Sequence, residues 1–255
     1  MNRFTILGCG SSLGSPWITN YFGSCDKKDP KNFRTRCSAH IQYKDLSIFI
    51  DTSPDIKTQF HRNKLKDIDA VIYTHEHSDQ TSGIFELRPF FWKNKRKIPV
   101  YGSKKTIKEL KEKYTFCFSE RHGYQPIMKP IVVRNKFSIK KNKTSLLLNS
   151  FEVQHGMIKA TGYSFKKIAY ISDCNHIPKR SLKYLKNLNY LIIDCLRNAK
   201  HPSHFNLEDA LGLAKKTNPK KTILTNLHVD FDYLTLKKKL PPNVIPAFDG
   251  LSFNF

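Results

Sequence analysis

The 255-residue sequence lacks the cysteine pattern of a disulfide framework or of a zinc ribbon. Its six cysteines are widely scattered, and none forms a CxxC pair. Disulfide scaffolds and structural zinc sites depend on such spacings, so these thiols are expected to be buried or incidental. With apolar residues at 39% of the chain, stability is expected to come from an ordinary apolar core.

Long apolar runs are also missing. No stretch approaches the ~20 residues that span a bilayer, and the first residues lead into a strand-like segment rather than a signal peptide. We expect a cytoplasmic protein with no membrane partner. The sequence contains no internal repeat and no linker, so a single domain over residues 1–255 is expected.

Acidic residues are scarce relative to basic ones. The 21 Asp and Glu stand against 44 Lys and Arg, which gives a formal charge of +23. Such a surface attracts phosphates or nucleic acid. The excess of lysine either reflects background composition or creates a positive field that attracts an anionic partner. Likewise Arg34, Arg36 and residues 27–31 either contact a substrate phosphate or form a solvated basic loop.

Short apolar runs bounded by turn residues are typical of β-strands. They predict strands at residues 3–7, 47–50, 70–73, 99–101, 146–153, 168–171, 190–193 and 222–224. Apolar spacings of three and four predict helices at residues 104–113, 179–188, 207–217 and 233–240. The Lys-rich runs 93–97 and 136–143 are predicted to be exposed loops or turns. This order favours an α/β fold with two sheets packed face to face and helices outside.

A histidine-rich segment follows the apolar run that ends near Thr74. His75, His77 and Asp79 alternate along it, and alternate residues of extended chain project to the same side. Imidazole nitrogens and carboxylate oxygens are ligands for divalent metals. An HxHxD loop after a strand therefore predicts a hydrolytic metal site, and a chance surface cluster is the less favoured interpretation.

Three further candidate ligands each follow a predicted strand, namely His155, Asp173 and His228. Strand ends on one rim are where α/β folds gather active-site groups. A single histidine is more often a core or surface residue, and a single strand-end aspartate often caps a turn. The recurrence of the pattern is what indicates a shared site.

The order of these motifs resembles the metallo-β-lactamase superfamily over nearly the whole chain. The resemblance lies in the glycine-rich turn at 7–16, the FIDT segment at 49–52, THxHxD at 74–79, HG at 155–156 and SD at 172–173. Within the superfamily the sequence is most similar to the branch that holds phosphoribosyl cyclic phosphate phosphodiesterase and tRNase Z. That similarity adds the segments 36–38, 99–102, 204–207 and 248–250. The resemblance implies an αβ/βα four-layer sandwich and a metal-dependent phosphodiesterase.

The resemblance also implies roles for single residues. It assigns His75, His77 and His155 to a first metal site, Asp79 to a second site and Asp173 to the bridging carboxylate. It assigns to His204 a role in catalysis from a flanking loop; a polar surface loop is the alternative. Asp79, where it holds no ion, is expected to orient the attacking water as a base.

Two departures from the family pattern fall on the second metal site. Gln80 replaces the last histidine of HxHxDH, and Asn226 replaces the histidine of a Thr-His pair. Amide oxygens bind Zn²⁺ and Mn²⁺ less well than imidazole, so that site is weakened, lost or rebuilt with His228. The expected cofactor is Zn²⁺ or Mn²⁺, as one or two ions.

Three functions stay open from the sequence. The first is hydrolysis of a small cyclic or ribosyl phosphate ester by metal-activated water. The second is a tRNase Z-like ribonuclease, which the basic charge favours. The third is a degenerate, non-catalytic binding protein, which Gln80 and Asn226 allow. A small phosphorylated substrate is the expected partner, with nucleic acid and a homodimer as further expectations.

Overall fold

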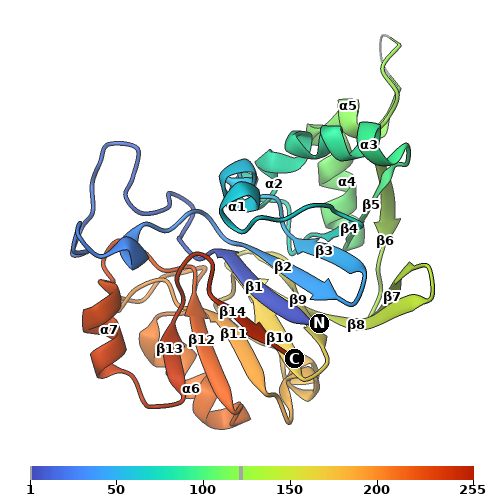
Figure 1. The fold of residues 1–255 in the computed structure, drawn as a ribbon. Coiled ribbons are helices and arrows are strands. Elements are labelled where there is room, and N and C mark those ends of the chain that lie inside the picture. The colour runs from blue at the N-terminus through green and yellow to red at the C-terminus, as the bar shows by residue number, and fades with distance from the viewer. Residues whose placement is uncertain (1, 121–122) are drawn as a thin grey trace.

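The structure is a computed structural model that describes residues 2–120 and 123–255, and its strands form two mixed seven-stranded sheets (Figure 1). The strands of the first sheet are, in spatial order, β14 (Ser252–Asn254), β1 (Arg3–Gly8), β2 (Ser38–Tyr43), β3 (Leu46–Ile50), β4 (Ala70–Ile72), β5 (Ile98–Gly102) and β6 (Met128–Val132). Those of the second are β13 (Val244–Pro246), β12 (Lys221–Thr225), β11 (Tyr190–Asp194), β10 (Ile168–Ile171), β9 (Ile158–Phe165), β8 (Thr144–His155) and β7 (Lys136–Lys141).

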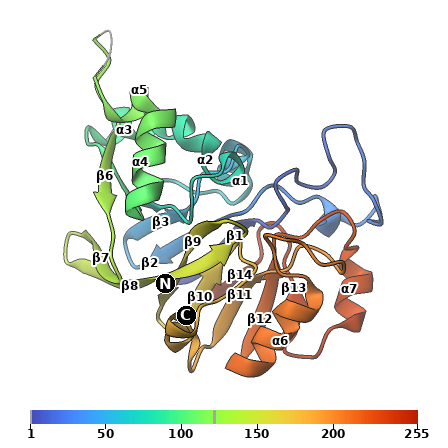
Figure 2. The ribbon, with the colours of Figure 1, turned by 180° about the vertical axis from the view of Figure 1, so that it is seen from behind.

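Helices cover the outer face of each sheet (Figures 1 and 2). The first sheet carries α1 (Ile56–Arg62), α2 (Ser78–Thr81), η2 (Ser82–Leu87), α3 (Arg88–Asn94), α4 (Lys104–Lys113) and α5 (Thr115–Phe118). The second carries η3 (Lys179–Leu185), α6 (Leu207–Thr217) and α7 (Tyr233–Lys239), while η1 (Pro30–Asn32) lies in the first long loop.

Three apolar clusters separate these layers. The central cluster joins inward-facing residues of both sheets, such as Phe4, Ile48 and Tyr163. The outer two lie between one sheet and its helices, with Phe49 and Leu110 in one and Leu191 and Leu213 in the other. Each sheet buries apolar residues on both of its faces, so one face must pack against the other sheet and the opposite face against helices. The four-layer α/β sandwich expected from the sequence is confirmed.

The best-predicted helix is α6, whose bounds match the expectation. Asn206 accepts a hydrogen bond from the Asp209 backbone N–H, and the Asp209 side chain accepts one from the Asn206 N–H in return. Such a capping box satisfies free backbone donors and sets the first turn. Helix α4 also begins and ends at the predicted residues.

Two predicted elements were wrong. The run 136–143 is not an exposed loop, because residues 136–141 form edge strand β7, which pairs antiparallel with β8 and buries Ile139. Lysines on an edge strand keep its outer side in water. The predicted helix at 179–188 is a 3₁₀ helix that ends at Leu185, since the chain must turn before β11 begins at Tyr190.

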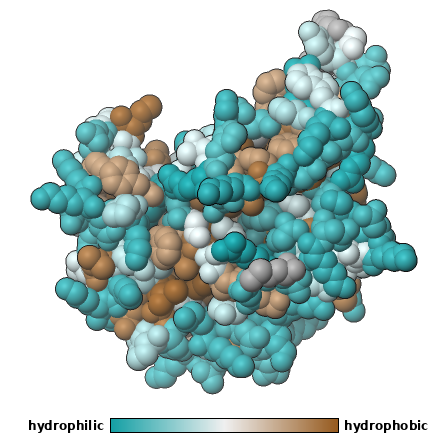
Figure 3. Space-filling model, in the orientation of Figure 1, coloured by the Kyte–Doolittle hydropathy of each residue, from teal (hydrophilic) through white to brown (hydrophobic). Residues whose placement is uncertain are grey.

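None of the helices in the described ranges 2–120 and 123–255 is long and apolar enough to cross a membrane. Hydrophilic residues cover most of the face seen in Figure 3, with apolar residues scattered in smaller groups.

Candidate metal centre

Parallel pairing gathers three polar residues at one edge of the second sheet. Strands β10, β11 and β12 run parallel in register, so their carboxyl ends lie at the same edge. Asp173 follows β10, Asp194 ends β11 and Asn226 follows β12. All three are buried. The topology therefore makes a polar cluster from residues that are far apart in the sequence.

The histidines reach this edge from both sheets. His155 ends β8. Strand β9 pairs antiparallel with both β8 and β10, so β8 and β10 run in the same direction. His75 and His77 follow β4 of the first sheet. The two sheets are linked there by a hydrogen bond from the Thr161 N–H to the Thr74 carbonyl (2.8 Å).

The imidazoles of His75, His77 and His155 form a triangle. Their ring centroids lie 4.6 to 5.1 Å apart, and the His155 Nε2 to His77 Nδ1 distance is 3.3 Å. A tetrahedral zinc with nitrogens at about 2.0–2.1 Å holds neighbouring nitrogens about 3.3–3.4 Å apart. The spacing of this pair fits a shared divalent ion.

Hydrogen bonds set the proton position on two of these rings. His155 Nδ1 lies 2.7 Å from the Ser203 carbonyl oxygen, and a carbonyl only accepts, so Nδ1 carries the proton and Nε2 is free. The Thr74 hydroxyl donates to Asp51 (2.8 Å) and lies 3.0 Å from His75 Nδ1. It therefore accepts from that ring and leaves His75 Nε2 without a proton.

The remaining nitrogen of His75 has the properties of a metal ligand. His75 Nε2 is buried and has no hydrogen-bond partner among the described residues. Burial lowers the pKa of His75 to about 3, so the ring is neutral near pH 7. Burial, and next His155, also lower the pKa of His77. A neutral buried imidazole with an unused lone pair fits a divalent cation.

A second group of possible ligands connects the three histidines with the carboxylates at the ends of the strands of the second sheet. His155, Asp173 and His204 bring ligand atoms within 4.8 Å of one another. His204 Nδ1 lies 2.8 Å from Asp194 Oδ2. Burial opposes a charge on His204, but Asp194, Asp173 and Asp79 outweigh it and raise the pKa of His204 to about 9. His204 is thus an imidazolium that can give up a proton.

The side-chain amides of Gln80 and Asn226 donate hydrogen bonds to the carboxylates of the metal centre. Gln80 Nε2 donates to Asp79 (3.2 Å) and to Asp173 (3.3 Å). Asn226 Nδ2 donates to Asp173 (3.4 Å) and to Asp194 (3.0 Å). Hydrogen-bond donors to a carboxylate stabilise its charge without a cation.

Asp79 and His228 line a cavity of about 200 Å³ beside the centre, together with Asp173, His204 and Asn226. Burial, and next Asp173, raise the pKa of Asp79 to about 6. His228 belongs to neither of the two ligand groups found in the described chain, and its Nδ1 lies 3.1 Å from Asp230 Oδ2. Its role as a metal ligand stays a prediction.

The two arginines of the first loop have structural partners. Arg34 is 2% exposed and donates to the carbonyl oxygens of His228 (3.1 Å) and Phe231. Arg36 forms a bidentate ion pair with Asp55 at 2.6 and 2.7 Å. These contacts position the loop, and contact of either arginine with a substrate phosphate stays a prediction.

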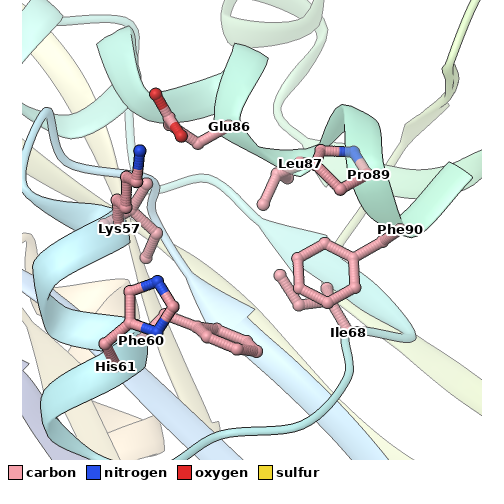
Figure 4. A pocket seen from close by; sticks show the side chains of 9 residues that line it. Lys57, Phe60, His61, Ile68, Glu86, Leu87, Pro89 and Phe90 are labelled. Carbon is pink, nitrogen blue, oxygen red and sulfur yellow. The ribbon is translucent and has the colours of Figure 1, made fainter. Parts of the chain in front are cut away.

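Another cavity, of about 260 Å³, lies between α1 and the segment from η2 to α3 (Figure 4). Its floor is apolar, with Phe60, Ile68, Leu87 and Phe90, and Lys57 and Glu86 stand at its edge. None of the histidines of the metal centre lines it.

Sequence reasoning did not identify Asp194, and it noted Asp51 and Thr74 only as parts of family motifs, without a supporting role for either. Asp194 also accepts a hydrogen bond from the Cys174 N–H (2.8 Å), so it holds the loop that follows Asp173. Each of the three stands at or just after a predicted strand end, which is the same signal that identified Asp173. Applied to every strand end, that signal would also have found Asp194.

Comparison with known proteins shows the family and the fold of the chain. The model of the beta-lactamase superfamily domain matches residues 47–226, more than half of the chain. A solved diphosphatase from the PhnP family is 30% identical, covers 100% of this chain and 98% of its own, and superposes with a TM-score of 0.88. The short form of human tRNase Z, 18% identical with 99% and 98% covered, has a TM-score of 0.71 and shares the fold.

Two curated relatives are longer than this chain. An octanoyltransferase of Porphyromonas gingivalis is 28% identical over 253 residues, which are 98% of this chain and 51% of that protein. The exodeoxyribonuclease YycJ of Bacillus anthracis is 25% identical over 150 residues, 54% of this chain and 50% of that protein. The chain spans about half the length of these relatives. Its domain match and its full-length similarity to the diphosphatase show that it belongs to the beta-lactamase superfamily, as a metallohydrolase of the metallo-β-lactamase fold.

Proposed function

We propose that the protein is a metal-dependent phosphodiesterase acting on a small phosphorylated substrate, such as a cyclic or ribosyl phosphate ester. The observation that carries this proposal is the convergence of three imidazoles beside Asp173 and a protonated His204. Similarity to a diphosphatase at 30% identity supports chemistry at phosphorus. The cavity of about 200 Å³ suits a small molecule.

His75, His77, His155 and Asp173 would hold the ion. When bound, it would polarise the phosphoryl oxygens and lower the pKa of water from 15.7 to about 7. Asp79, with its pKa raised to about 6, is ionised near pH 7 and accepts a proton from the attacking water. His204 donates its proton to the leaving oxygen, and Asp194 orients the ring.

We infer that one ion suffices. The amides of Gln80 and Asn226 donate hydrogen bonds to Asp79, Asp173 and Asp194, and these stabilise the carboxylates where a second cation would otherwise be required. Three imidazoles and a carboxylate accommodate either Zn²⁺ or Mn²⁺.

Replacement of one ligand tests the proposal. His77→Ala removes an imidazole from an exposed position, so the fold should survive, while metal retention and hydrolysis of bis-p-nitrophenyl phosphate should both be lost. His61→Ala, an exposed histidine on α1, is the matched control and should keep both. Unchanged turnover in His77→Ala rules out this mechanism.

A tRNase Z-like ribonuclease is the second candidate, favoured by the charge of +23 and by the shared fold. RNA binding that weakens steeply with salt, together with RNA cleavage, would support it. A third outcome, metal bound without turnover of any phosphate ester, would identify a non-catalytic binding protein.

A further inference from the structure

The helical layer of the first sheet exposes aromatic side chains to solvent at a distance from the metal centre. Helices α3 and α5 lie side by side in this layer (Figures 1 and 2). Each of the seven residues of α3 keeps at least part of its surface in solvent. Phe90 and Phe91 pack partly against the apolar cluster beneath, whereas Trp92 is exposed. Exposed apolar groups that gather on one surface mark a site of interaction.

The exposed rings of this layer lie in contact with one another and with one arginine. The Arg88 guanidinium carbon lies 5.6, 4.7 and 5.2 Å from the ring centroids of Phe85, Trp92 and Tyr124. The rings of Phe85 and Phe116 lie 5.6 Å apart. The four aromatic side chains are 46% to 64% exposed. We call these five residues the aromatic patch.

The charge of Arg88 is available to a partner. None of the ion pairs in the described ranges 2–120 and 123–255 includes Arg88. Ring faces attract a guanidinium above and below its plane, and they leave the N–H groups at its edge free to donate. A partner of the patch therefore needs flat apolar groups for the rings and an anion for Arg88.

Single-stranded nucleic acid supplies both groups. Bases stack on aromatic rings, and phosphates pair with cations, which the charge of +23 attracts to the molecule. A second copy of the chain is a poorer match, because a two-fold interface centred here places Arg88 near its own counterpart. An anionic lipid surface is also a poorer match, since membrane-surface binding depends on a long apolar helix face and α3 has only seven residues.

We propose that the aromatic patch binds single-stranded nucleic acid. Bases stack on its exposed rings, and a phosphate of the strand accepts hydrogen bonds from Arg88. The residues lining the cavity of about 200 Å³ at the metal centre are a separate set. The inference therefore goes beyond the proposed function, and binding at the patch requires neither the metal nor turnover.

Anisotropy of a fluorescein-labelled oligothymidylate of about 12 nucleotides tests the patch. The proteins are the metal-loaded wild type, Trp92→Ala and Arg88→Met. Lys183→Met and Tyr184→Ala are matched controls, because the Lys183 Nζ lies 5.1 Å from the Tyr184 ring on η3 of the second sheet. Inorganic polyphosphate and phosphatidylglycerol vesicles serve as competitors that carry negative charge without bases.

Fluorescence of Trp92 reports stacking directly. The chain has two tryptophans, so Trp17→Phe leaves Trp92 as the only indole. A base stacked on Trp92 should quench its emission, with the same midpoint as the change in anisotropy. Binding is also measured on His77→Ala, which should keep it. Loss of hydrolysis in that variant concerns the proposed function alone.

Trp92→Ala and Arg88→Met should each weaken binding of the oligonucleotide by about fivefold to a hundredfold, while both controls bind as the wild type does. Equal affinity in the patch variants and the controls contradicts the inference, as does Trp92 emission that stays unchanged on binding. Displacement of the strand by polyphosphate at the same phosphate concentration would show attraction by charge alone. Vesicle binding or self-association that depends on Trp92, without binding of the strand, would identify a different partner and overturn the proposal.

Discussion

The positions of protons on the imidazoles decide whether this cluster can bind a cation. Ser203 fixes the His155 tautomer through its carbonyl, and Thr74, itself held by Asp51, fixes that of His75. Each contact leaves the nitrogen that faces the centre unprotonated. Partners of this kind orient metal-binding histidines and raise their basicity.

The acid and base roles of His204 and Asp79 predict a bell-shaped pH profile. A base must be ionised, so kcat/KM should fall as pH falls through the Asp79 pKa of about 6. An acid must be protonated, so it should fall as pH rises through the His204 pKa of about 9. His204→Gln should remove the alkaline limb and slow turnover by about 10² to 10⁴.

The substrate distinguishes acid catalysis from a structural role for His204. Loss of a proton donor should slow the hydrolysis of 2′,3′-cyclic AMP strongly, because its alcohol is a poor leaving group. It should slow the hydrolysis of bis-p-nitrophenyl phosphate far less, because that leaving group needs little protonation. Equal losses on both substrates, with an unchanged profile above pH 9, would show that His204 only supports the loop.

The two amides predict a change in metal stoichiometry. Gln80→His combined with Asn226→His replaces amide donors by imidazoles beside Asp79 and Asp173, so bound metal should rise from about one ion per chain toward two. Elemental analysis of the purified proteins measures this. Metal content that stays the same in the double variant would show that these positions do not suppress a second ion.

Among the elements, the β2–β3 hairpin contains a buried histidine that serves stability rather than the site. His40 is 4% exposed and lies 2.8 Å from Ser47 Oγ. The Ser47 hydroxyl donates to the Asp67 carbonyl (2.7 Å), so His40 donates from Nε2. Burial of the ring makes the neutral form the one that the hairpin stabilises.

Acid should destabilise the fold through His40. Burial lowers its pKa from 6.5 to about 4, so the unfolded chain binds the proton first. The stabilisation is complete above pH 6.5 and is lost as pH falls toward 4, by about 1.4 kcal/mol per pH unit. Urea unfolding near neutral pH and below pH 6 measures the slope. His40→Gln, which keeps a donor for Ser47, should show a shallower slope; an equal slope contradicts this account.

The sequence predicted the elements whose signals are local. Apolar runs followed by His75, His155 and Asp173 marked strand ends, and the capping residues of α6 marked a helix. Strand β7 was missed because its lysines suggest a loop, whereas pairing with β8 and burial of Ile139 decide its structure.

Contacts between distant segments were beyond sequence reasoning. Arg34 is buried because carbonyl groups nearly 200 residues away accept from it. The pairing of Asp194 with His204 likewise depends on how the loop before α6 folds back onto β11. Such contacts arise only once the sheets are assembled, so residue types and spacing do not reveal them.

In the whole molecule, the two sheets bring histidines and carboxylates from both halves of the chain to one edge: His75, His77 and Asp79 from the first, and His155, Asp173 and His204 from the second. The surface outside this edge is mostly hydrophilic on the face seen in Figure 3, and the chain carries a net charge of +23. A positive field concentrates anionic substrates near the molecule without selecting among them.

The most direct test of the central claim follows metal and turnover in the same sample. Chelator-treated protein is reloaded with Zn²⁺ or Mn²⁺ while bound metal and hydrolysis of bis-p-nitrophenyl phosphate are measured together. If His75, His77, His155 and Asp173 hold the catalytic ion, turnover rises in proportion to bound metal and levels off at about one ion per chain. Turnover that persists in the metal-free protein, or metal that binds without restoring it, contradicts the account.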